Sequence, residues 1–401
     1  MGIENGIPPS GIKGRLIAPP PRDNKKLAVV TTLGLSPLDK FAPEWTVAGL
    51  LKRFNPKLLE KVAFFMRIET GAPSYIRPLY DHGEPGALII YHGSKKLILV
   101  GDLHGNLPRF ELLLKKYGPA LWNGEIELVF LGDLIHPEKA GALDEMQDSI
   151  KMLNALIVLK KLFPTHVHLL IGNHDILFSE KKLGMALVEH WFEQAQNGLG
   201  YMLTKMGEMK LNPELDQVML VAKRETPQAV SMLATLVDEL KKQNMSLVEI
   251  QTMMWNYQEF LIGCPLSMVI KGSEGAIYLS HTIAHKIAHK DGGVSQTDLT
   301  RARHNGLYLQ LTMNRHSTDF TAEDLLANSR AMKLTEDPQQ THFVIGHEKD
   351  LSGWHYNPFP ERKLHIIHGN VEGAFGVVEV ENGVPKLVDL PVLSTPAEAA
   401  A

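Results

Sequence analysis

The sequence predicts an α/β protein in which polar clusters follow buried strands. Apolar runs that are typical of strands alternate with helical segments from about residue 87 onward. These runs are continuously apolar, which is typical of strands covered on both faces of a sheet. Six short clusters rich in Gly, Asp, Asn and His follow them: Gly101–Gly105, Gly132-Asp133, Gly172–Asp175, Ser280-His281, Gly346–Glu348 and His368–Asn370.

From residue 96 onward, the first predicted elements alternate in the order strand, helix, strand, helix and strand. Strands are expected over residues 87–91, 96–100, 127–131 and 166–171, and helices over 46–66, 107–117 and 142–162. Later strands are expected over 276–280, 342–345, 364–367, 374–380 and 386–390, the last two as a hairpin. Open α/β sheets place their sites at the carboxyl ends of strands, so the polar clusters mark the expected functional site.

The chain divides into five expected segments. These are an extended Pro-rich arm (1–44), the first half of the main domain (45–180), a helical insertion (181–262), the second half of the domain (263–392) and a tail (393–401). Inside the insertion, Ser246 and Glu249 form a capping-box pattern. Two interpretations of its Met-rich faces stay open: an arm that binds a partner or mediates dimerisation, or side chains that fill its own core.

Composition and charge argue against several kinds of partner. The chain has 401 residues and a formal net charge of −4, which gives no reason to expect nucleic acid or an anionic membrane as a partner. No run of about 18 apolar residues is present, so no membrane span is expected. The single cysteine, Cys264, excludes an intrachain disulfide, and the N-terminus lacks a signal-peptide pattern. We expect a cytoplasmic protein; a bacterial protein exported into a host cell fits the same observations.

Asp102, His104 and Asp133 are expected to begin a site for two metal ions. Two divalent ions a few ångströms apart need a bridging carboxylate and further oxygen and imidazole ligands. Asp102 and His104 lie two positions apart at a strand end, so both side chains can reach one ion. Asp133 follows the neighbouring strand and can place one carboxylate oxygen on each ion. We therefore expect Asp133 to be both a ligand and essential for catalysis.

The second ion is expected to take its remaining ligands from later clusters. Asn173, His281 and His347 each follow a predicted strand and carry suitable donor atoms. His281 has rivals nearby, because His285 and His289 follow it; their helical spacing is more typical of surface or supporting residues. The pattern thus predicts a second metal position that shares Asp133 with the first.

Catalysis in such a site is expected to use a hydroxide held between the metals for in-line attack on phosphorus. His174, next to the ligand Asn173, is placed to protonate the leaving oxygen as a general acid. Five other histidines are interpreted as structural: His166, His168, His342, His355 and His365.

The clusters resemble the motifs of the calcineurin-like metallophosphoesterase superfamily, and within it the phosphoprotein phosphatase (PPP) branch. That branch carries GDxHG, GDxVDRG and GNHE, then a later His, an RGHE-like segment and a closing SAPNY strand. The chain matches these motifs at Asp102, His104, Asp133, Asn173, His174, His281 and His347. Lys349 stands where the wider superfamily has a further His, and Asn370 aligns with the Asn of SAPNY; both favour the PPP branch.

The resemblance covers about residues 85–180 and 270–390. It implies a metallophosphoesterase fold, in which two mixed β-sheets form a sandwich flanked by helices. It also implies two divalent metal ions, Mn first, with Fe or Zn as alternatives.

The segment after Asp133 departs from the family. Ile135-His136-Pro137-Glu138 stands in place of VDRG, so His136 replaces the Asp that orients the general acid and Pro137 replaces an Arg that binds phosphate. An Arg gives two parallel hydrogen bonds to phosphate, so either another basic residue binds phosphate or the affinity for phosphate falls. The candidates are Lys139, Arg301, Arg303, Arg315 and Arg330. GNHE is also changed, to GNHD, which ends in Asp175.

Three functional hypotheses follow. The first is a metal-dependent phosphomonoesterase that acts on phosphoproteins, at Ser/Thr or Tyr. The second keeps the metals but takes dinucleotide polyphosphates or other small phosphoesters, which the changed segment after Asp133 favours. The third is a degenerate site whose helical insertion serves as a binding module; the intact set of ligands argues against it.

Overall fold

The computed structural model describes residues between Glu44 and Asp389. The gaps in this description are 81–82, 136–142, 176–234, 237–238, 241, 273–274, 286–292, 304–306, 316–317, 348–354, 357, 360–362, 368–375 and 382–383. Several predictions therefore lie outside the described residues. They concern almost all of the N-terminal arm, most of the insertion, the tail, the segment 136–139, His289, Lys349 and Asn370.

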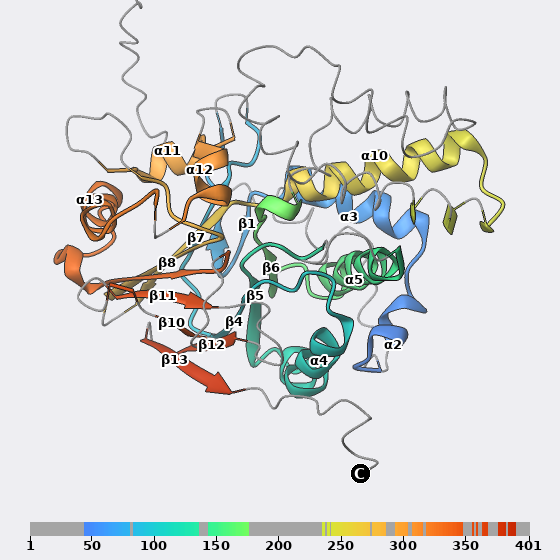
Figure 1. The fold of residues 1–401 in the computed structure, drawn as a ribbon, viewed down its shortest axis with the longest axis horizontal. Coiled ribbons are helices and arrows are strands. Elements are labelled where there is room, and N and C mark those ends of the chain that lie inside the picture. Colours follow the sequence, from blue (N-terminus) through green and yellow to red (C-terminus); the bar gives the residue numbers. More distant parts are fainter. Residues whose placement is uncertain are drawn as a thin grey trace, which may run out of the picture. The chain divides into compact units, whose positions relative to one another are not determined.

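Two mixed β-sheets form the centre of the described structure (Figure 1). The larger sheet has the order β1 (Gly71–Ala72), β2 (Tyr75–Ile76), β3 (Leu88–Tyr91), β7 (Ser267–Gly272), β8 (Gly275–Ser280), β9 (Thr341–Ile345), β11 (Leu364–Ile367) and β10 (His355–Tyr356). The smaller sheet has the order β13 (Val384–Asp389), β12 (Gly376–Glu381), β4 (Lys96–Val100), β5 (Ile126–Phe130) and β6 (Val167–Leu169). In each sheet, parallel and antiparallel pairs occur together.

Apolar side chains from both sheets form one buried cluster. Leu97 and Leu99 of β4 lie in this cluster with Ile277 and Leu279 of β8, which belongs to the other sheet. Residues two positions apart on a strand point to the same face, so these pairs mark the faces on which the sheets pack. The sandwich of two mixed sheets that the sequence predicts is thus confirmed.

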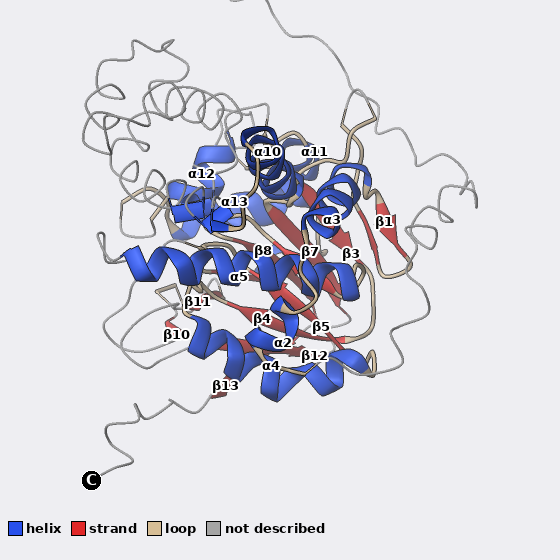
Figure 2. Cartoon of the chain, turned by 90° about the vertical axis from the view of Figure 1, so that its right-hand side faces the viewer, coloured by secondary structure: helices blue, strands red, loops and turns tan. Residues whose placement is uncertain are grey.

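Helices lie on both sides of the pair of sheets (Figures 1 and 2). The helices α4 (Leu107–Trp122) and α5 (Leu143–Leu162) contact β5 and β6 of the smaller sheet. The other helices are α2 (Val47–Leu51), α3 (Pro56–Ile68), α10 (Leu247–Gly263), α11 (Gln296–Thr300), α12 (Leu307–Met313), α13 (Ala322–Met332) and the short 3₁₀ helix η1 (Pro338–Gln340).

The structure corrects the prediction of one helix over residues 46–66. Two helices, α2 and α3, take its place, and residues 52–55 separate them. The side chain of Asn55 accepts a hydrogen bond from the backbone N–H of Leu58 at 3.0 Å, and Pro56 occupies the first turn of α3. Both features start a new helix rather than continue an old one, because Pro lacks the N–H that a helix interior requires.

The expected strands and helices of the main domain are present with small shifts at their ends. The run 96–100 forms β4 and 364–367 forms β11, as predicted, whereas α4 continues to Trp122, five residues beyond the expected end at 117. The sequence reasoning missed β7, which follows directly on α10. The expected hairpin is present as β12 and β13, which pair antiparallel.

The predicted capping box at Ser246 is confirmed at the start of α10. The Ser246 backbone N–H donates to Glu249 Oε2 at 2.7 Å, and the Glu249 N–H donates to Ser246 Oγ at 3.4 Å. α10 packs against α3, and Arg67 Nε of α3 lies 3.0 Å from Glu259 Oε2 of α10. The last part of the expected insertion therefore packs against a helix of the first half of the chain, while the boundaries of the insertion stay a prediction.

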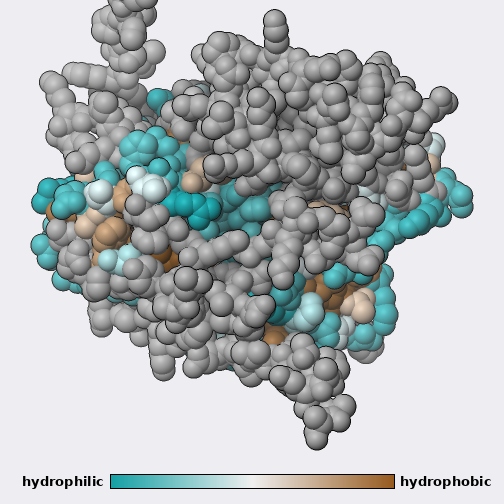
Figure 3. All heavy atoms as spheres, viewed as in Figure 1, coloured by the Kyte–Doolittle hydropathy of each residue, from teal (hydrophilic) through white to brown (hydrophobic). Residues whose placement is uncertain are grey.

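A few large apolar side chains of the described residues are exposed: Phe64, Ile76, Leu79, Val248 and Trp255. On the face that Figure 3 shows, the apolar residues lie in several small groups among hydrophilic ones. The most exposed large apolar side chains are Val248 and Phe64, at 68% and 55%. Among the helices of the described part, none combines the length and the apolar character that crossing a bilayer requires.

Candidate metal centre

The residues of the expected site follow the carboxyl ends of five strands that belong to both sheets. In the smaller sheet, the parallel strands β4, β5 and β6 precede Asp102, Asp133 and Asn173. In the larger sheet, the parallel strands β8 and β9 precede His281 and His347. Parallel strands end at the same edge of a sheet, and the packed sheets bring these two edges together. Residues that lie far apart in the sequence thereby meet in one buried place.

One group of ligand atoms surrounds the side chain of His281, which is fully buried. His281 Nε2 lies 3.0 Å from Asn173 Oδ1, 3.1 Å from His347 Nδ1 and 3.3 Å from Asp133 Oδ2. On the other side of the ring, His281 Nδ1 lies 3.0 Å from the carbonyl oxygen of Leu131. Since a carbonyl oxygen only accepts, this bond places the proton of the neutral ring on Nδ1 and leaves Nε2 as an acceptor.

Such a group of atoms fits a metal ion. An unprotonated imidazole nitrogen, an amide oxygen and a carboxylate oxygen are all acceptors, and without a cation they repel one another at these distances. A second ring nitrogen that donates to a backbone carbonyl, as His281 Nδ1 does, is the usual support of a metal-binding histidine. Asn173, His281, His347 and Asp133 could therefore hold one divalent ion.

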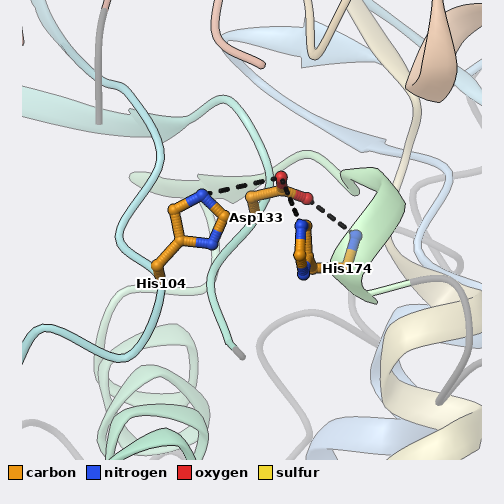
Figure 4. Close-up of side chains that lie close together, drawn as sticks. All are labelled: His104, Asp133 and His174. Carbon is orange, nitrogen blue, oxygen red and sulfur yellow. Dashed lines mark hydrogen bonds and ion pairs between the residues drawn. The ribbon is translucent and has the colours of Figure 1, made fainter. Parts of the chain in front are cut away.

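A second group lies around His104, Asp133 and His174 (Figure 4). Asp133 Oδ2 is 3.9 Å from His104 Nε2 and 3.9 Å from His174 Nε2. Asp102 Oδ2 is 3.7 Å from the same nitrogen of His104. His104, Asp133 and His174 thus form a second group of ligand atoms, and Asp102 adjoins this group through His104.

Asp133 belongs to both groups. In each group the ligand atoms lie within 4.8 Å of one another, and Asp133 is the member that the two share. The side chain is buried, at 2% exposure, and its other oxygen, Oδ1, accepts the backbone N–H of His174 at 2.9 Å. Asp133 is thus the one residue that the two groups of ligand atoms share.

The backbone is strained at three of these residues. The φ angles of His104, Asp133 and His347 are 47°, 49° and 65°, in the left-handed region that residues other than Gly rarely adopt. Each such residue costs about 1–3 kcal/mol and persists only where the surroundings hold it. Hydrogen bonds supply that hold: the backbone N–H groups of Leu103 and His104 both donate to the Asp133 carbonyl oxygen at 2.9 Å.

Two glycines make room for the carboxylates. A Cβ atom at Gly172 would collide with Asp133 Oδ1, and one at Gly346 would collide with Asp102 Oδ1. Because Gly346 has no side chain, the next residue can approach Asp102. The His347 backbone N–H lies 3.1 Å from both oxygens of the Asp102 carboxylate. This contact joins a loop of the larger sheet to a loop of the smaller one.

Burial shifts the pKa values of Asp102 and His347 toward their neutral forms. Desolvation raises the pKa of Asp102 to about 8, and the nearby Asp133 carboxylate adds to this shift. Desolvation also holds the pKa of His347 well below its usual range, helped by the neighbouring His281 and by the positive charge of Arg315. Without a bound cation, the fold thus penalises charge on both residues.

Asp175 is a site residue that sequence reasoning did not single out. Its carboxylate is fully buried and accepts two backbone N–H groups, from Leu134 at 3.1 Å and from Gly172 at 2.9 Å. The sequence signal was its place at the end of the GNHD cluster, two residues after Asn173. Nothing in the sequence could show which loop it would bind.

The structure separates the basic residues that were candidates for phosphate binding. Arg303 makes another contact, in which its guanidinium donates to the backbone carbonyl oxygen of Cys264. Arg301 ends α11, and Arg330 lies exposed in the last turn of α13. Arg315 is exposed, and its charge acts on His347 in the candidate centre. Lys139 lies outside the described residues.

Several other histidines take part in contacts away from the centre. His168 Nε2 lies 2.8 Å from Glu127 Oε2, and His342 Nδ1 lies 3.1 Å from His365 Nε2. His285, a rival for the place of His281, instead lies 3.3 Å from the side-chain amide of Asn314.

Comparison with protein families found a match that begins just before β4. Residues 95–223 match the family model described as calcineurin-like phosphoesterase. That segment contains the first five residues of the expected site: Asp102, His104, Asp133, Asn173 and His174.

A search of solved structures found a weak likeness to a described phosphatase. It is a protein serine/threonine phosphatase from Saccharomyces cerevisiae with similarity to human phosphatase PP5. The TM-score is 0.46 and the sequence identity 13%, over 85% of this chain and 90% of that one.

The stabilisation of the protein by a divalent metal should grow with pH. The pKa of Asp102 in the metal-free fold, about 8, lies above its ordinary value of 3.8. A carboxyl group with a raised pKa favours the folded state at low pH, and this contribution is lost as the pH rises through about 8. A bound cation replaces the proton, so the metal-loaded protein should not show the loss.

Melting temperatures with and without Mn²⁺, measured from about pH 5.5 to pH 8.5, test this prediction. The difference between the two curves should widen toward high pH, and Asp102→Asn should remove most of the widening. A difference that stays constant or narrows would contradict the predicted coupling.

Proposed function

We propose that this calcineurin-like metallophosphoesterase hydrolyses phosphate monoesters at a centre of two divalent metal ions. The observation that carries the proposal is the position of Asp133. Its carboxylate belongs to a group with His104 and His174 and to a group with His281 and His347. A carboxylate shared in this way suits the bridging ligand that a two-metal site needs.

The ligands divide between the two ions as follows. Asp102, His104 and Asp133 would hold the first ion. Asp133, Asn173, His281 and His347 would hold the second. Carboxylate oxygens and imidazole nitrogens suit Mn²⁺, and they also suit iron or zinc. When bound, the ions supply Lewis-acid charge for the phosphoryl oxygens and a nucleophile from water for in-line attack on phosphorus.

We assign the role of general acid to His174. Its backbone N–H is held by Asp133 Oδ1, while its side chain is 16% exposed, more than those of His104 or His281. The ring therefore lies at the open side of the centre, where it can deliver a proton to a leaving oxygen. Hydrogen bonds within the chain thus hold the loops that carry the proposed ligands, and they place His174, the proton donor, beside these ligands.

A phosphoprotein is the substrate class that we favour, and Arg315 is the residue that we place at the phosphate. Pro137 stands where the resemblance expects an Arg, so that contact must come from elsewhere. Arg315 is exposed and close enough to lower the pKa of His347. A guanidinium can hold two phosphate oxygens at once.

The changed segment after Asp133 also supports a second candidate, hydrolysis of dinucleotide polyphosphates or other small phosphoesters. Turnover of a phosphopeptide set and of nucleotide polyphosphates, measured with the same Mn²⁺-loaded protein, separates the two. Preference for the phosphopeptides is expected. A clear preference for the polyphosphates would replace the first candidate with the second.

Asp133→Asn should abolish metal-dependent hydrolysis of para-nitrophenyl phosphate, because an amide offers a single neutral oxygen in place of two charged ones. Metal analysis should show fewer than two ions bound per chain. Asp148→Asn, a change of the same kind on the exposed surface of α5, is the control and should leave both readouts unchanged. Normal turnover in Asp133→Asn would refute the two-metal assignment.

His174→Ala should slow hydrolysis by about 10²–10⁴-fold while both metals stay bound, since a general acid contributes about that much. The loss should be smaller for a substrate whose leaving group needs no proton, such as para-nitrophenol, than for a phosphoserine peptide. His92→Ala, at an exposed histidine, serves as the control. Loss of a metal ion in His174→Ala would make this residue a ligand instead.

Arg315→Ala should raise the KM for a phosphopeptide about tenfold to a hundredfold, the effect of losing hydrogen bonds between charged groups. Arg330→Ala, at another exposed arginine, should leave KM unchanged. An unaltered KM in Arg315→Ala would show that a different residue binds the phosphate.

A further inference from the structure

Asp175 lies at the junction of two loops that carry the proposed ligands. One oxygen of its carboxylate, Oδ1, accepts the backbone N–H of Leu134, the residue after Asp133. The other oxygen, Oδ2, accepts the backbone N–H of Gly172, the residue before Asn173. A single side chain thus binds the loop after β5 and the loop after β6 at the same time.

The contacts around Asp175 leave it little freedom. The side chain is fully buried, and each oxygen is bonded to a backbone group that cannot rotate away. Asp133 makes the complementary contact from the other loop, where its Oδ1 accepts the His174 N–H. The two carboxylates therefore tie the same pair of loops, one from each side, with Asn173 and His174 between these ties.

We propose that Asp175 is a positioning residue that sets the distance from the bridging Asp133 to Asn173 and His174. The proposal rests on the function proposed above, which it deepens. We assign Asp175 no metal in this arrangement, because among the described residues it belongs to neither group of ligand atoms around Asp133. Through Asn173 it would control the affinity for the second ion, and through His174 the placement of the general acid.

Asp175→Asn breaks this arrangement with little change in volume. An amide can accept from one of the two N–H groups, but its own NH₂ then faces the other donor. The loop that carries Asn173 and His174 should move away from Asp133. Residues that support metal ligands commonly cost 10–100-fold in affinity when changed, so the Kd for the second Mn²⁺ should rise about that much.

The matched control is Asp324→Asn. Asp324 is also a buried carboxylate that accepts a backbone N–H, from Thr321 at 2.8 Å, but it caps α13, away from the centre. Calorimetric titration with Mn²⁺ should show two ions bound to the wild type and to Asp324→Asn. In Asp175→Asn, the first ion should bind nearly as in the wild type and the second more weakly.

Asp175→Glu should recover part of the loss, since it keeps two charged acceptor oxygens and is the residue of the GNHE motif. Amide hydrogen exchange in the wild-type protein gives a test that needs no variant. The N–H groups of Leu134 and Gly172 should exchange slowly even without metal.

Three results would overturn the proposal: wild-type affinity for both ions in Asp175→Asn, an equal loss in Asp324→Asn, or rapid exchange of both amides. Failure of the two-metal function itself would look different, because the wild type would then fail to bind a second ion.

Discussion

The crowding of acceptor atoms around Asp133 is the constraint on which the rest of the structure depends. A carboxylate oxygen, an amide oxygen and an imidazole nitrogen from separate loops lie about a hydrogen-bond length from His281 Nε2. The tautomer of His281 nevertheless leaves no proton between its Nε2 and Asn173 Oδ1. Such an arrangement is unfavourable for the folded protein alone and favourable around cations. The left-handed backbone of His104, Asp133 and His347 adds to the same cost.

The two sheets make this crowding possible. Candidate ligands from the smaller sheet and from the larger sheet meet because apolar side chains such as Leu99 and Leu279 hold the sheets face to face. The His347 N–H then binds the Asp102 carboxylate across the junction. The core thus fixes the distance between ligands that are more than 200 residues apart in the sequence. Metal affinity and the stability of the fold should be closely linked for this reason.

The sequence placed the candidate ligands at strand ends because each follows an apolar strand, and strand ends are what periodicity detects. The same reasoning divided the chain correctly around β4, β5 and β9 but merged α2 and α3, since the helical spacing of apolar residues continues through Asn55-Pro56. It could not find the role of Asp175, because the two amides that it binds are set by tertiary structure. Nor could it foresee the positive φ angles, which no local preference of His or Asp requires.

The most direct test of the two-metal centre is a crystal structure of the protein grown with Mn²⁺, with anomalous scattering data collected near the manganese edge. We expect two anomalous peaks about 3.5–4 Å apart, with the Asp133 carboxylate between them. A single peak, or two peaks of which only one contacts Asp133, would contradict it.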